Sequence, residues 1–276
     1  MLLTRPAPPA LRAVARQLWA GAPDGPTPAR PGTREHVLPT GHMHLAFRLS
    51  GPALRLFRGD GDETGLTFGH AVVGGARASF HVRDISVATR SVGVLLQPGA
   101  ARVLFGVPDG ALADTHTPLD ALWGPAAEAA LARLHALDAP AAQLDLLERL
   151  LLQRVAAWTH AEIGPPPAVA MALGLLAQLD ASVAQAVRAS GYSHRHFVAL
   201  FREHAGLTPK AYARLKRLGR VIALAAEPAR GWADIAQAAG YGDQSHLSRD
   251  FCAFAGLPPQ AWRRRAAPGA PRHVAL

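Results

Sequence analysis

Five histidines are the residues of the first half of the chain whose chemistry stands out. His42 and His44 alternate by two on a predicted strand and therefore point to one face, and His36, His70 and His81 belong to the same region. Imidazoles that share a face can bind zinc, iron or copper. A metal site is therefore one hypothesis for this region, and surface or hydrogen-bonded histidines are the other.

The motifs of the common enzyme classes are missing from the sequence. It contains no GxSxG nucleophile motif, no P-loop, no GxGxxG dinucleotide fingerprint and no HExxH zinc motif. Isolated serine, histidine and aspartate residues say nothing about spatial proximity. We therefore expect no catalytic residues and a protein that is not an enzyme.

Positive charge is concentrated in the last two fifths of the chain. The 276 residues carry a formal net charge of +9, and residues 168–276 hold 14 Lys and Arg against 6 Asp and Glu. Because neutralising phosphates releases counterions from nucleic acid, a localised cationic surface favours a nucleic-acid partner. Charge alone leaves a second interpretation open, in which the arginines serve solubility.

The same cationic segment contains an internal repeat. Each copy has small apolar residues before a Gly-Tyr pair, then two apolar positions, a glycine, a proline and a final aromatic residue. The Gly-Tyr pairs lie 49 residues apart, and the later positions 50 apart. The first copy comprises Val183, Ala184, Val187, Gly191, Tyr192, Phe197, Phe201, Gly206, Pro209 and Tyr212, and the second Ile235, Ala236, Ala239, Gly240, Tyr241, Leu247, Phe251, Gly256, Pro259 and Trp262.

The order of residues within a copy predicts a helix, a tight turn and a second helix. Gly191 permits a left-handed turn, and Ser193 is placed to cap the second helix by accepting from its free amides. Gly206 predicts the end of that helix, and residues 208–209 predict the cap and first turn of the next. Asp243 takes the capping position in the second copy. The pattern is that of a helix-turn-helix unit, present twice.

Residues 168–265 resemble the paired helix-turn-helix DNA-binding domain of the AraC/XylS family of transcriptional regulators. The resemblance rests on the two motifs in tandem, and most on the segment AQAAGYGDQSHLSRDF over residues 236–251, followed by GLPP over residues 256–259. It implies a sequence-specific regulator whose two recognition helices enter the major groove on one side of the duplex. We expect an activator, although the sequence does not separate activation from repression.

A long helix over residues 208–226 is expected to join the two units. At about 1.5 Å per residue it would span about 28 Å, which approaches the ~34 Å between successive major-groove segments on one side of a duplex.

The expected DNA contacts lie on the side of each recognition helix opposite its buried face. Arg195 is the best candidate for reading a base in the first copy, whereas Val198 offers only apolar contact with thymine methyl groups. In the second copy Gln244 can pair with adenine and Arg249 with guanine. The complete set of expected DNA-binding residues is His194, Arg195, Val198, Arg202, Gln244, Ser245, Ser248 and Arg249.

The spacing of apolar residues in the first part of the chain changes near residue 106. Short apolar runs separated by glycine-rich turns predict strands over residues 44–49, 53–57, 78–82, 85–88, 92–96 and 102–105. Leucines at helical spacing then predict amphipathic helices, and consecutive prolines interrupt them.

We therefore expect an α+β protein. It has a β-rich N-terminal sensor or dimerisation domain with a helical end over residues 1–163, and a proline-rich linker over residues 164–167. An all-α DNA-binding domain follows over residues 168–276, with two helix-turn-helix units joined by a long helix.

The resemblance further implies that the N-terminal domain is cupin-like in shape and senses an effector, dimerises, or both. Metal-binding cupins have a Glu after their histidine pair and a Gly before it, whereas Arg48 and His36 stand in those neighbourhoods here. We therefore expect neither a metal nor another cofactor. The expected partners are double-stranded DNA and a small-molecule effector, with RNA polymerase and a second copy of the chain as further candidates.

Two alternatives of other classes stay open. The histidines leave room for a metal-dependent cupin-type enzyme with a DNA-binding appendage, and the helical pairs for a protein-interaction module. The charge-free apolar stretch over residues 168–179 is shorter than the ~20 residues of a membrane helix, and Cys252 alone cannot form an intrachain disulfide. We expect a cytoplasmic protein with no membrane partner.

Overall fold

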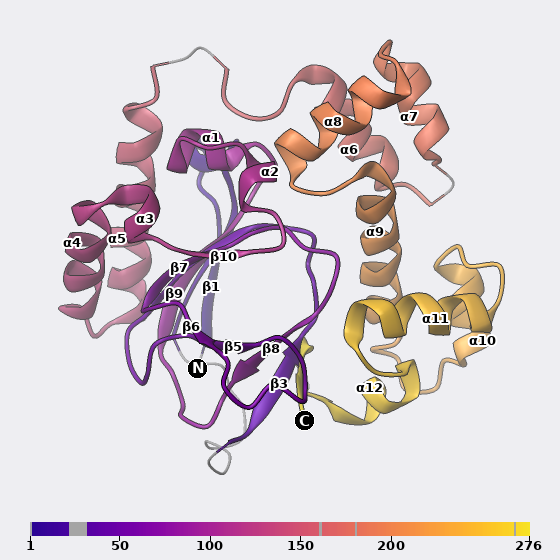
Figure 1. Cartoon of the computed structure of the whole chain (residues 1–276), viewed down its shortest axis with the longest axis horizontal. Coiled ribbons are helices and arrows are strands. Elements are labelled where there is room, and N and C mark those ends of the chain that lie inside the picture. The colour runs from indigo at the N-terminus through magenta and orange to yellow at the C-terminus, as the bar shows by residue number, and fades with distance from the viewer. Residues whose placement is uncertain (1, 22–31, 160–161, 180, 268) are drawn as a thin grey trace.

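The computed structural model describes residues 2–21, 32–159, 162–179, 181–267 and 269–276. The described residues form two six-stranded sheets, built mostly from the first part of the chain, with one group of helices beside them and a second group formed by the C-terminal part (Figure 1). The predicted α+β class is confirmed. No helix among the described residues is long and apolar enough to cross a bilayer.

The first sheet has the order β1-β2-β9-β4-β7-β10, and its pairings are antiparallel. Its strands are β1 (Leu2–Pro6), β2 (Ala15–Gly21), β9 (Ser91–Leu96), β4 (His44–Arg48), β7 (Ala71–Gly74) and β10 (His116–Pro118). Leu45 and Phe47 alternate with His44 and Arg48 along β4, and the two apolar residues enter the N-terminal core. The opposite side of β4 faces the second sheet.

Helices cover the apolar face of the first sheet. The long helix α5 (Pro140–Ala156) packs across β2 and β9, and α4 (Pro125–His135) packs against α5. The shorter elements of this part are η1 (Pro9–Leu11), α1 (Ala100–Phe105), α2 (Asp109–Leu112) and α3 (Asp120–Trp123). The predicted amphipathic helices after residue 108 are therefore present.

The second sheet has the order β11-β12-β3-β8-β5-β6. Its strands are β11 (Ala266–Ala267), β12 (Ala270–Ala275), β3 (Arg34–Val37), β8 (His81–Asp84), β5 (Arg55–Phe57) and β6 (Leu66–Thr67). The strand β12, from the end of the chain, pairs with β3 near its beginning. The tail of the segment expected to bind DNA thus belongs to a sheet of the N-terminal part.

Two strand predictions fail in an informative way. Residues 102–105 lie in helix α1, because Gly99 adopts a left-handed conformation and the Asp109 carboxylate accepts from the amides of Gly99 and Ala101 at the start of the helix. Residues 85–88 form no strand, since the Asp84 carboxylate accepts from the Ser86 amide and turns the chain. A short apolar run does not by itself distinguish a strand from a buried helix.

Before the tail strands, the described residues of the C-terminal part form seven helices. They are α6 (Pro167–Leu176), α7 (Val183–Ser190), α8 (His194–Ala205), α9 (Pro209–Leu224), α10 (Trp232–Ala238), α11 (Gln244–Ala255) and α12 (Pro259–Arg265). Their apolar faces form one core together with Leu38, Ala76 and Val274 from the N-terminal part and the tail strand. The two parts of the chain therefore share buried surface.

Gly74 is required by the way in which β4 and β7 pair. It lies opposite His44, and a Cβ at this position would come within 2.2 Å of the His44 ring. We expect Gly74→Ala to lower the free energy of unfolding by about 1–3 kcal/mol through overpacking, measured by denaturant titration. Combining it with His44→Ala should recover part of the loss, because the second change removes the ring.

The matched control for this prediction is Gly59→Ala. A Cβ at Gly59 meets no atom within 4 Å, so this variant should unfold like the wild type. Equal stabilities of the Gly74 and Gly59 variants would contradict the packing argument.

Candidate nucleic-acid interface

The turns and caps of the two helix-turn-helix units follow the predicted pattern. Gly191 and Gly206 have φ values of 72° and 68°, so both occupy the left-handed region. Ser193 accepts from the amide of His196 at 3.4 Å, and Asp243 accepts from that of His246 at 2.6 Å. Each recognition helix, α8 and α11, therefore begins at a capped residue and ends at a glycine.

Helix α8 presents most of its expected contact residues to solvent. His194, Arg195 and Arg202 are exposed, whereas Val198 is half-buried and packs against the C-terminal core. In the part of the chain that the structure describes, the side chains of Arg195 and Arg202 make no hydrogen bond or ion pair. Both guanidinium groups are therefore available to an external anion.

Helix α11 has the same arrangement. Gln244, Ser245 and Arg249 are exposed and Ser248 is half-buried. On the opposite side of the helix, Leu247 and Phe251 are buried. The polar side is continuous from the N-terminus of α11, which is where recognition helices meet base edges.

Arginines of the connecting helix α9 make contacts within the C-terminal part. Arg214 donates from two nitrogens to Asp250 at 2.7–3.2 Å, and Asp250 is nearly buried. Arg217 lies over the Tyr241 ring at 5.2 Å, and Arg220 donates to the Ala177 carbonyl. The Arg214 and Arg217 contacts hold the second unit on α9, and the Arg220 contact holds the end of α6 on it. No local sequence signal indicates the Arg214–Asp250 pair, whose members are 36 residues apart.

The N-terminal part touches both units at equivalent turns. A Cβ at Gly206, after α8, would lie 3.1 Å from Ala76 and 3.3 Å from the Asp109 carbonyl. A Cβ at Gly256, after α11, would lie 2.6 Å from Phe80. Both recognition helices therefore rest on the N-terminal part by their C-terminal ends, and their N-terminal ends, which carry the exposed polar residues, are directed away from it.

Further contacts strengthen the two docking points, which are the turn at Gly206 after α8 and the turn at Gly256 after α11. At the first docking point, α2 packs against α8, and Arg102 forms an exposed ion pair with Glu203 at 2.5 Å. At the second, His36 bonds through Nδ1 to the Ala255 carbonyl at 2.9 Å and through Nε2 to Asp60 at 2.9 Å. His36 therefore joins the end of α11 to the residue Asp60 of the N-terminal part.

Strands β3 and β12 connect the interior between the sheets with the second unit. On β3, Glu35 points inward, where it accepts from Arg83 and His273, and the next residue His36 points to α11. Burial alone would raise the pKa of Glu35, but these two partners hold it below its ordinary value. On β12, His273 faces Glu35, whereas Val274 is buried in the C-terminal core.

A pocket of about 310 Å³ lies between the sheets, lined by both polar and apolar side chains. His81 and His116 meet there with ring centroids 4.9 Å apart, and His44 lies 6.0 Å from His116. Arg77 donates to Nδ1 of His116 at 3.2 Å and to the Asp114 carbonyl at 3.1 Å. The lining residues are Leu56, Phe57, Arg58, Leu66, Phe68, Arg77, His81, Asp114, Thr115 and His116.

The five histidines considered for metal binding do not come together as a group. Only His44 and His81 meet, and they meet around His116, which the sequence analysis did not single out. His36 points to α11, and His42 is a separate buried ring whose pKa burial lowers to about 3. Among the described residues, no three His, Cys, Asp or Glu side chains are arranged to hold a metal ion.

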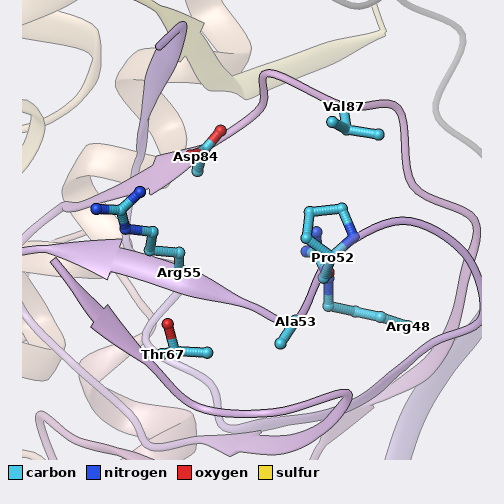
Figure 2. A pocket seen from close by; sticks show the side chains of 7 residues that line it. All are labelled: Arg48, Pro52, Ala53, Arg55, Thr67, Asp84 and Val87. Carbon is cyan, nitrogen blue, oxygen red and sulfur yellow. The ribbon is translucent and has the colours of Figure 1, made fainter. Parts of the chain in front are cut away.

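A second hollow, of about 240 Å³, is shown in Figure 2. Arg55, Thr67 and Asp84 come from the neighbouring strands β5, β6 and β8, and Arg48 lies behind Pro52 on the other side. Arg48 donates from Nε to the Pro52 carbonyl at 3.0 Å, and burial lowers its pKa to about 10. Arg55 donates to the carbonyls of the loop before β6, so most of its donors are already used.

Two family models match parts of the chain. Residues 186–265 match a helix-turn-helix domain, and residues 4–118 match a domain of unknown function (DUF6597). The first match contains both recognition helices, and the second covers most of the two sheets. No curated protein matches the chain.

Solved structures of ToxT from Vibrio cholerae are similar to the chain at low identity. An apo variant is 12% identical, covers 94% of this chain and 99% of its own, and has a TM-score of 0.49. ToxT with a bound unsaturated fatty acid is 12% identical over 85% of this chain and 96% of its own, with a TM-score of 0.45. A further ToxT structure is 9% identical over 84% and 95%, with a TM-score of 0.44.

Asp109, at the first docking point, is expected to make stability depend on pH. Burial raises its pKa to about 7, against the lowering effect of the amides of Gly99 and Ala101. This pKa lies above that of the same group in the unfolded chain. Protonated Asp109 therefore adds to the free energy of unfolding at low pH, and this addition is lost as the pH rises through about 7. Between about pH 5 and about pH 8, the free energy of unfolding of the wild type should fall by about 1–3 kcal/mol relative to that of Asp109→Asn, measured by denaturant titration. A difference that stays constant with pH would contradict this prediction.

Proposed function

We propose that this chain is a transcriptional regulator of the AraC type, since its residues 186–265 match a helix-turn-helix domain. In this proposal α8 and α11 enter successive major-groove segments by their N-terminal ends. Arg195, Gln244 and Arg249 read base edges, and His194, Arg202, Ser245 and Ser248 contact bases or phosphates. Val198 is half-buried, so only part of its side chain can contact a thymine methyl group.

A single observation supports this proposal most. Both recognition helices dock on the N-terminal part by their C-terminal turns, at Gly206 and Gly256, and this leaves their polar N-terminal halves exposed. Helix α9 joins the two units, and its 16 residues span about 24 Å at ~1.5 Å per residue (Figure 1). With a recognition helix beyond each end of α9, the pair suits groove segments ~34 Å apart.

The N-terminal part acts, in this proposal, as an effector domain whose ligand controls the position of the units. The pocket beside His81 is the candidate binding site, and β3 and β12 carry the change to α11 and α12. The fatty acid of the ToxT structure belongs to that protein. Support for an effector here comes from the pocket and from the two strands that face both the sheet interior and the helices.

The remaining features of the proposal follow from this role. The chain works as a regulator without catalysis, in the cytoplasm, where chromosomal duplex DNA is accessible. Domains over residues 1–163 and 168–276, joined by residues 164–167, share the work of sensing and binding. RNA polymerase and a second copy of the chain are its candidate protein partners.

DNA recognition is tested by Arg195→Ala and Arg249→Ala. The probe is a duplex that the wild-type protein selects from a random pool, and the readout is fluorescence anisotropy at fixed salt. Each change should weaken binding by about 1–3 kcal/mol, because a bidentate contact to a base is lost, with the circular dichroism spectrum unchanged.

The matched control is Arg133→Ala, which removes the same charge from an exposed position on α4. It should leave the affinity within experimental error. Wild-type affinity in both the Arg195 and Arg249 variants would refute the contact assignment.

The docking of the second unit is tested by His36→Ala. Loss of the bond to the Ala255 carbonyl and of the stacking on Phe80 should loosen α10–α12, with faster amide hydrogen exchange there than in α7 and α8. The control is Arg102→Ala, which affects the exposed ion pair at the first docking point. Exchange that changes equally in both units would show that His36 does not anchor the second one.

A further inference from the structure

We propose that the pocket between the sheets binds a small organic acid, with its carboxylate held by Arg77, His81 and His116. The inference rests on the proposed function in one respect, since it gives the effector a chemical class. The binding itself is a property of the N-terminal part and can be measured without DNA.

Arg77 provides the positive charge for this site. Its side chain is partly buried, and this burial lowers the pKa of the guanidinium. The described residues give it no ion pair: Asp114 accepts through its backbone carbonyl, and the second partner is a neutral imidazole nitrogen. Its Nε is buried without a hydrogen-bond partner. The Asp114 carboxylate, which also lines the pocket, raises the pKa of Arg77 but forms no ion pair with it. A partly buried cation without a carboxylate in contact is costly, and an anionic ligand in contact with it would reduce that cost.

The neighbouring histidines are neutral hydrogen-bond donors. Because a guanidinium can only donate, Nδ1 of His116 must accept, which places the proton of His116 on Nε2. Burial, and then Arg77 and His44, lower the pKa of His116 to about 2, so the ring stays neutral near pH 7. The His81 ring is partly buried, and its buried Nδ1 has no partner among the described residues. Arg77 and these two rings thus offer a carboxylate several unused donors.

The other walls of the pocket are apolar and suit the body of an organic acid. Leu56, Phe57, Leu66 and Phe68 line the same pocket as the donors, and the volume of about 310 Å³ admits a small aliphatic or aromatic acid. One buried guanidinium matches the single charge of a carboxylate better than the double charge of a phosphate ester. A polar end facing an apolar wall is the usual design of a ligand pocket.

Backbone strain marks the same place. Asp114 has a φ of 59°, the only positive φ at a non-glycine residue among those described. The Arg77 bond to its carbonyl and the bond from its own amide to the Ala76 carbonyl hold this conformation. Strain of this kind concentrates at ligand sites, where the surroundings fix it.

The test compares acids with their uncharged analogues on the full chain. Hexanoate and benzoate are titrated by isothermal calorimetry against hexanamide and benzamide, with sodium phosphate as the inorganic anion. At least one carboxylate should bind the wild type about 10- to 100-fold more tightly than its amide, because charge-assisted hydrogen bonds are lost with the amide. Equal binding of acid and amide, no binding of either, or tighter binding of phosphate would each overturn the proposal.

Variants assign the binding to this pocket. Arg77→Met should weaken the carboxylate about 10- to 100-fold, and Arg77→Lys should lose less, because it keeps the charge. If Arg77→Met unfolds, His81→Leu provides the second measurement, with a smaller loss expected from one neutral donor. The matched control is Arg55→Met in the other hollow, which should bind like the wild type. A loss in the Arg55 variant with none in the Arg77 variants would place the ligand elsewhere and refute the assignment.

This experiment separates the ligand from the regulatory role. Carboxylate binding is measured on the protein alone, and DNA binding on the selected duplex alone. Absence of carboxylate binding with intact DNA binding would overturn only the ligand class. Carboxylate binding in a chain that does not select any duplex would leave the pocket assigned and refute the proposed function.

Discussion

The docking of both recognition helices by their C-terminal turns is the constraint on which the rest of the structure depends. Gly206 and Gly256 occupy equivalent positions in the repeat, and both approach the N-terminal part so closely that a side chain would collide or displace its neighbours. A recognition helix held at its C-terminal end has its N-terminal end free, and that end contacts bases in helix-turn-helix proteins. The same contacts that join the two parts of the chain therefore determine which residues DNA can reach.

Electrostatics inside the sheet pair differ from those of an ordinary core. Arg77 and Arg83 lie there with three neutral imidazoles, whereas the carboxylate of Glu35 is already shared between Arg83 and His273. Retaining buried charge is expensive unless it is paired, so such an interior is better explained by ligand binding than by stability. Adjacent residues of β3 and β12 face opposite sides of the second sheet. A displacement of a side chain in the interior is therefore passed to the helices by the next residue of the same strand.

Much of the C-terminal part was predictable because its signals are local. A glycine that must adopt positive φ, a capping Ser or Asp and buried residues at helical spacing all act within one turn or one helix, and they recur in both copies of the repeat. The N-terminal part was less predictable. Residues 102–105 form a helix because Asp109, several residues later, accepts from the amides at its start, and β12 is a strand because β3 is beside it.

The sequence by itself determined the two helix-turn-helix units, their caps and turns, and the exposed polar side of each recognition helix, since these depend on short-range hydrogen bonds and on periodicity. Only the tertiary structure decided that Arg214 pairs with Asp250 and that His116 joins His44 and His81. It also decided that the tail strand β12 pairs with β3. These contacts join residues that are tens to hundreds of positions apart. Their partners are selected by packing of whole elements, and no pattern confined to neighbouring residues contains that information.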